Sequence, residues 1–171
     1  MNRSWFRSWS YRSILLGMLR VMLAGMLLGG CFSPPSAYVL DSDDPLDLEV
    51  ARAAVDEWNS QGGYDLLIRA GSYGTQADDE CAIIWGDMGN AGPRGYTTGD
   101  GRLITLTTNV HDPWYKGVGP CAGSDMQSIL AHEIGHTLGK EHTNSPADTM
   151  YAGGTTWCEI KHVLTDTDIE Q

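Results

Sequence analysis

Basic residues are scarce in this sequence. It has 11 Lys and Arg against 22 Asp and Glu, which gives a formal net charge of -11. Four of the basic residues are arginines in the first 20 positions, ahead of the first acidic residue, Asp41. Without residues 1–30 the other 141 residues have 7 basic and 22 acidic side chains, a net charge of -15. Such a surface repels phosphate backbones and argues against nucleic acid as a partner.

The chain also lacks the length for two domains, and it contains no internal repeat. Its 171 residues, of which 42% are hydrophobic and 19% charged, are typical of one globular domain. We therefore expect a single folded domain that acts as a monomer.

A hydrophobic run long enough to span a membrane is missing as well. Residues 21–30 read VMLAGMLLGG, which is the length of a signal-peptide core, and Arg20 interrupts the apolar stretch that begins at Ile14. A membrane span needs about 20 apolar residues. The sequence therefore predicts a signal peptide over residues 1–30, and an uncleaved anchor helix is the alternative.

The end of this run, Leu28 to Cys31, resembles a bacterial lipobox. The resemblance implies cleavage before Cys31 and lipidation of its thiol, so that the proline-rich residues 31–37 would form a tether. Phe32 stands where an Asp would favour retention at the inner membrane. We therefore expect an exported protein, anchored by lipid at the bacterial cell envelope, in the outer membrane or at the cell surface.

No CxxC pair occurs, which argues against a cysteine metal site. With Cys31 lipidated, Cys81, Cys121 and Cys158 remain, and an oxidising environment allows one disulfide among them. The sequence favours Cys81 with Cys121, because the first opens a predicted strand and the second precedes a predicted helix. The other two pairings stay open.

The segment that follows the tether has clear helix and strand patterns. Asp44 before Pro45 predicts the start of an amphipathic helix, which ends at Gly62 and Gly63. Short apolar or β-branched runs predict strands over residues 38–40, 66–70, 81–85, 96–98 and 103–108. These elements predict an α/β sandwich with a mixed sheet.

A second amphipathic helix begins near Ser124, which has the capping-box spacing to Gln127. Gly139 ends it. Its apolar positions recur on one face: Met126, Ile129, Leu130, Ile134 and Leu138.

Residues 132–142, HEIGHTLGKEH, carry the chemistry of this helix. His132 and His136 are one turn apart, about 6 Å along the axis and on one face, so both imidazoles can bind one ion. Gly139 permits the turn that brings His142 back as a third ligand. Glu133, about 100° around the helix from His132, can reach a water on that ion. Histidines on an apolar helix face are often only core residues, but the complete motif on a capped helix favours one catalytic Zn²⁺ with an open coordination position.

This motif resembles the zinc signature of the metzincin metalloendopeptidases, and Met150 lies where that clan has its Met-turn. Thr143 and Tyr151 make the matrixins the most similar family. The resemblance covers residues 38–171 and implies a matrixin-like catalytic domain of the α/β (α+β) class. Its fold would be a mostly parallel sheet with an antiparallel edge strand, two main helices and a short C-terminal segment, in which Thr165 and Asp168 would cap a last helix.

The chain departs from the matrixin pattern in several places. Residues 86–95 contain no HxD, so a second, structural zinc is not expected. Asp87 and nearby carbonyls could hold Ca²⁺, although a plain turn-rich loop is the favoured interpretation. Residues 152–154 lack the Pro-x-Tyr wall of the matrixin specificity pocket, which leaves the side-chain preference open.

The predicted function is that of a zinc endopeptidase acting on extracellular or cell-envelope proteins. Zinc would activate a water and polarise the scissile carbonyl, while Glu133 acts as the general base. By resemblance, the extended substrate would pair with the edge strand near residues 96–98. The alternative is a lipid-tethered, zinc-containing module that binds peptides without cleaving them. A peptidase that trims chain ends is less favoured, because no charged residue is found to block the groove.

Overall fold

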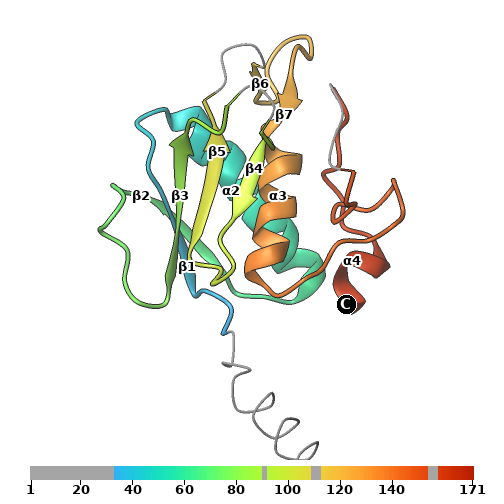
Figure 1. Ribbon diagram of the computed structural model, residues 1–171, viewed down its shortest axis with the longest axis horizontal. Helices are drawn as coiled ribbons and strands as arrows, with labels where there is room; N and C mark the ends of the chain where they lie inside the picture. Colours follow the sequence, from blue (N-terminus) through green and yellow to red (C-terminus); the bar gives the residue numbers. More distant parts are fainter. Residues whose placement is uncertain (1–32, 90–91, 109–112, 154–157) are drawn as a thin grey trace, which may run out of the picture. The chain divides into compact units, whose positions relative to one another are not determined.

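The computed structural model describes residues 33–89, 92–108, 113–153 and 158–171 (Figure 1). The predicted signal peptide and the lipidated Cys31 lie outside these residues. No helix in the described part of the chain has the length and apolar character needed to cross a membrane. The described residues belong to one structural unit, Ser33–Gln171.

The unit is built on a five-stranded sheet with the order β2-β1-β3-β5-β4. Four strands run parallel, and β4 lies antiparallel to β5 at one edge. The bounds are β1 Ala37–Leu40, β2 Leu67–Ala70, β3 Glu80–Gly86, β4 Gly95–Thr97 and β5 Leu103–Thr107. This arrangement confirms the predicted fold class.

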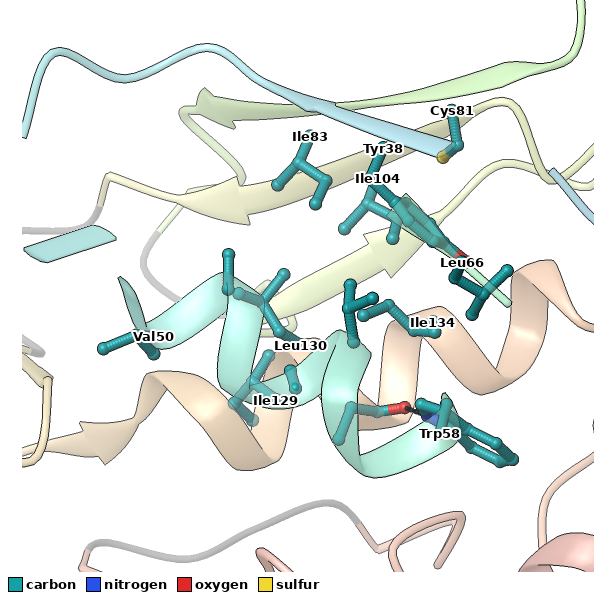
Figure 2. Packing of buried hydrophobic residues seen from close by; sticks show 14 of the residues in the cluster. Tyr38, Val50, Trp58, Leu66, Cys81, Ile83, Ile104, Ile129, Leu130 and Ile134 are labelled. Carbon is teal, nitrogen blue, oxygen red and sulfur yellow. Dashed lines mark hydrogen bonds between the residues drawn. The ribbon is translucent and has the colours of Figure 1, made fainter. Parts of the chain in front are cut away.

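Helix α2, Pro45–Gly62, begins and ends at the residues that the sequence indicated. The Asp44 side chain accepts a hydrogen bond from the Leu46 amide at the start, and Gly63 adopts the left-handed conformation (φ 71°) after the end. Its buried face packs against the sheet and against α3, and Figure 2 shows the two helices lying along the same face of the strands. Trp58 links them, because its indole nitrogen donates to the carbonyl of Ala131 (2.8 Å).

Helix α3, Met126–Thr137, is capped differently from the prediction. Asp125 is the N-cap and accepts from the Ser128 amide (2.8 Å), so the predicted capping box of Ser124 with Gln127 is wrong. The reason is that Ser124 belongs to a strand: β7, Ser124–Asp125, pairs in parallel with β6, Trp114–Tyr115. The sequence analysis did not anticipate this two-stranded ladder.

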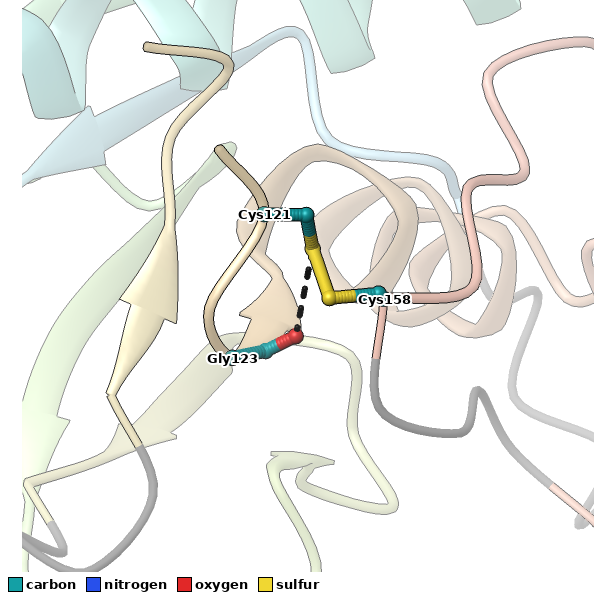
Figure 3. The surroundings of a disulfide bond; sticks show 3 residues. All are labelled: Cys121, Gly123 and Cys158. Atoms are coloured by element: carbon teal, nitrogen blue, oxygen red, sulfur yellow. Dashed lines mark hydrogen bonds between the residues drawn. A yellow bond between two sulfur atoms is a disulfide. The ribbon is translucent and has the colours of Figure 1, made fainter. Parts of the chain in front are cut away.

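The disulfide joins Cys121 to Cys158, with 5.7 Å between their Cα atoms (Figure 3). The prediction that Cys81 pairs with Cys121 is therefore wrong. Cys81 lies in β3 and is fully buried in the hydrophobic core, where burial raises the pKa of its thiol to about 12. Cys81, in the central strand β3, packs in the core cluster with residues of α2 and α3 (Figure 2).

Candidate metal centre

Helix α3 and the turn after it bring three histidines together. His132 and His136 lie one turn apart on α3, and Gly139 (φ 81°) reverses the chain directly after the helix. The reversal is fixed by the Lys140 amide, which donates to the carbonyl of Gly135 (2.9 Å). As a result, Nε2 of His142 lies 3.2 Å from Nε2 of His132 and 3.2 Å from Nε2 of His136.

These separations suit a tetrahedral zinc site. Nitrogen ligands about 2.05 Å from a tetrahedral zinc ion lie about 3.3 Å from one another. The potential ligand atoms of the three histidines all lie within 4.8 Å of one another. Among the described residues, no other set of three or more His, Cys, Asp or Glu side chains is close enough to hold a metal.

The hydrogen bonds of Nδ1 in His132 and His136 determine the tautomers of these two rings. Nδ1 of His132 lies 2.7 Å from the carbonyl oxygen of Thr149, and Nδ1 of His136 lies 2.9 Å from that of Lys140. A carbonyl oxygen only accepts hydrogen bonds, so each Nδ1 carries the proton and each Nε2 presents a lone pair to the shared space. His142 can donate to only one of them, and a bound cation satisfies all three nitrogens.

Burial favours the neutral form of two of the imidazoles, those of His132 and His142. It lowers the pKa of His132 to about 4 and also lowers the pKa of His142, with the neighbouring histidines acting in the same direction. A metal ligand must be unprotonated, so protons compete weakly with a metal here near neutral pH. The residues therefore fit zinc in number, distance and protonation.

Glu133 lies beside the histidines on α3, with only 6% of its surface exposed. Its Oε2 accepts a hydrogen bond from the hydroxyl of Thr97 in β4 (2.6 Å). Burial raises the pKa of Glu133, and the hydrogen bond from Thr97 opposes this shift only in part. The sequence analysis did not single out Thr97, because nothing in a short strand indicates which distant side chain its hydroxyl will meet.

Met150 is fully buried beneath α3. A Cβ atom added to Gly135 would collide with its sulfur, so the glycine of HEIGH makes room for this methionine. The carbonyl of Met150 accepts from the Thr143 amide (2.8 Å), which ties the segment that follows His142 to the Met150 turn. Met150 thus packs behind the histidines and not among them.

Asp168 holds the Met150 turn in place, a role that the sequence did not indicate. It caps the short helix α4, Asp166–Glu170, together with Thr165, as predicted. Its fully buried carboxylate also accepts from the amides of Thr149 (3.1 Å) and Met150 (2.9 Å). Because Thr149 in turn accepts from His132, Asp168 fixes the orientation of that imidazole through the backbone.

The structure gives no support to the calcium prediction. Asp87 Oδ1 accepts from the Gly89 amide (2.8 Å), a hydrogen bond local to the loop. Asp87 belongs to no cluster of potential ligands among the described residues. Calcium at Asp87 stays a prediction from the sequence.

Comparison with known proteins places this site in a family. The matrixin family model matches residues 38–171, which include all three histidines, Glu133 and Met150. A crystal structure of a zinc-dependent peptidase from Methanocorpusculum labreanum (strain Z) is similar at 15% sequence identity and a TM-score of 0.44, over 67% of this chain and 86% of that chain. Because the family model covers residues 38–171, well over half of the chain, the chain belongs to the matrixin family of zinc-dependent peptidases.

Proposed function

We propose that this protein is a zinc endopeptidase in which His132, His136 and His142 hold the metal and Glu133 is the general base. The observation that carries the proposal is the convergence of three ring nitrogens beside a buried carboxylate on the same helix. Three histidine ligands leave one coordination position of a tetrahedral zinc ion open, which is the arrangement of catalytic zinc and not of structural zinc.

Different residues of the chain have different roles in the proposed hydrolysis. When bound, zinc supplies Lewis-acid chemistry, because it makes water more acidic and polarises the scissile carbonyl. Glu133 takes the proton from the attacking water and passes it to the leaving amine. The hydrogen bonds of Nδ1 in His132 and His136 hold both rings in the tautomer that binds a metal. No side-chain nucleophile is required, so the reaction has no covalent intermediate.

Strand β4 supports an extended substrate. It is the last strand of the sheet, pairs only with β5 among the described strands, and packs against α3. An extended peptide can add to such an edge as a further strand. Tyr96, with 53% of its surface exposed, lies at the centre of β4 on the face turned away from Glu133. We propose that the substrate peptide lies along β4 with an internal peptide bond at the metal site. Cleavage away from the two ends of the substrate is what defines an endopeptidase.

A peptide-binding module without catalysis is the alternative function. Digestion of an unbiased peptide library by the zinc-loaded domain, residues 38–171, separates the two. We expect internal cleavage that a chelator abolishes and that added zinc restores. Binding of peptides without any cleavage would favour the alternative, and release of terminal residues alone would indicate an exopeptidase.

We also propose that the protein is exported and anchored by lipid at Cys31, which would restrict its substrates to extracellular or envelope proteins. Cys31→Ser should move the protein from the membrane fraction to the soluble fraction, because acyl chains and not the short apolar run provide the anchoring. Fractionation followed by immunoblotting measures this, with Cys81→Ser as the matched control. A Cys31→Ser protein that still sediments with membranes would indicate an uncleaved anchor helix.

A further inference from the structure

The Glu133 side chain packs against the face of β4 that is turned toward α3. Residues 95 and 97 point to the same side of the strand, toward α3, because side chains alternate along a strand. At position 95 there is no side chain: a Cβ atom added to Gly95 would lie 2.7 Å from both Cγ and Oε1 of Glu133. At position 97 the threonine hydroxyl contacts Oε2. Glu133 therefore packs directly on the backbone of β4 and is held there by one polar contact.

The Thr97 hydroxyl has one proton and two acceptors within reach. Its oxygen lies 2.6 Å from Oε2 of Glu133 and 3.1 Å from the backbone carbonyl oxygen of the same residue. A hydrogen bond to a charged carboxylate is shorter and stronger than one to a neutral carbonyl, so the proton points at Oε2. This contact joins residues 36 positions apart in the sequence, and it connects the edge strand to the helix that carries the ligands.

The two oxygens of Glu133 are consequently not equivalent. Oε2 is occupied by Thr97, whereas Oε1 accepts no hydrogen bond from any side chain or amide in the described part of the chain. Rotation about the last side-chain bond would exchange the two oxygens, and it would break the Thr97 contact in doing so. The Thr97 hydroxyl therefore restricts the carboxylate to one orientation.

We propose that Thr97 is a positioning residue for catalysis, which holds Glu133 so that Oε1 is the oxygen that takes and returns the proton. This inference rests on the proposed role of Glu133 as general base. In this proposal β4 has two roles, because the strand that would pair with the substrate also orients the general base that acts on the substrate. Displacing a catalytic group by about 1 Å can cost a factor of about 100 in rate.

Kinetics of Thr97→Val, Thr97→Ser and a matched control test the proposal. Thr97→Val keeps the shape and removes the hydroxyl, so we expect kcat to fall about 10- to 100-fold, with KM and bound zinc unchanged. Thr97→Ser keeps the hydroxyl and should recover most of kcat. Thr105→Val makes the same change on β5, opposite Tyr96, and should leave kcat as it is. Equal losses in the valine and serine variants, or a change confined to KM, would overturn the proposal.

Unfolding of the zinc-free protein gives a second measurement that does not depend on activity. Thr97→Val should lower the urea midpoint in the native background, and it should lower it less in a Glu133→Ala background, where the carboxylate is missing. Equal shifts in both backgrounds would show that the hydroxyl does not act on Glu133. If Glu133→Ala cleaves peptides at the native rate, the proposed function is wrong. If Thr97→Val cleaves at the native rate and Glu133→Ala does not, only the positioning role of Thr97 is wrong.

Discussion

Replacing Glu133 by alanine is expected to lower kcat by about 10²- to 10⁴-fold, the usual contribution of a general base. Bound zinc should be unchanged, because all three histidines and the backbone carbonyls that orient them remain. Glu133 is a buried carboxylate next to His132 in the sequence, and its replacement by alanine removes the proposed proton acceptor but keeps the three histidines. Peptide cleavage and metal content, measured on the same preparation, check the prediction.

His136→Ala is the control for this experiment. It removes a ligand, so zinc and activity should be lost together. Equal loss of zinc in Glu133→Ala and His136→Ala would contradict the assignment of roles. Undiminished cleavage by Glu133→Ala would exclude the carboxylate as the base, even with the three histidines in place.

Met150→Lys is expected to destabilise the protein by more than about 3 kcal/mol and to lower zinc occupancy. Met150 is fully buried, and its sulfur packs against Gly135 on the helix that carries two of the ligands. An ammonium group at this depth would lack a partner and would face a divalent cation nearby. Thermal unfolding and bound zinc, with and without chelator, measure both effects.

Met150→Leu is the conservative comparison. Leucine is close to methionine in volume, so this variant should lose less than about 1.5 kcal/mol and keep its zinc. A Met150→Lys protein with full zinc and an unchanged unfolding midpoint would mean that position 150 is exposed in solution. That outcome would be incompatible with the packing of the Met150 turn beneath α3.

The parts of the fold that the sequence predicted correctly are those specified by neighbouring residues. Asp44, Pro45 and Gly63 fix the ends of α2 through local hydrogen bonds and backbone conformation. The histidine spacing of residues 132–142 likewise follows from helix geometry, and the structure brings the three rings together as that spacing indicated.

The features that the sequence did not predict depend on contacts between distant segments. The sequence indicates Asp168 only as a cap of a short helix. Its carboxylate also accepts hydrogen bonds from the amides of Thr149 and Met150, seven and eight residues after the third histidine. Thr97 meets Glu133 only because β4 lies against α3. Cys158 pairs with Cys121 and not with Cys81 because the path of the chain after Met150 returns to the start of α3. Helix and strand propensities and the spacing of motifs do not indicate which distant segments of the chain come together.

The disulfide has a consequence for what happens when the chain itself is cut. Cys121 and Cys158 close a covalent ring that contains α3, the three histidines and Met150. Closing a ring of this size lowers the entropy of the unfolded chain and favours the native state by about 4 kcal/mol in the chain-entropy model. A single cut anywhere inside the ring, including a self-inflicted one, leaves both pieces joined through sulfur. The metal-binding residues can then stay on one molecule after nicking, whereas an open chain would separate into fragments that share them.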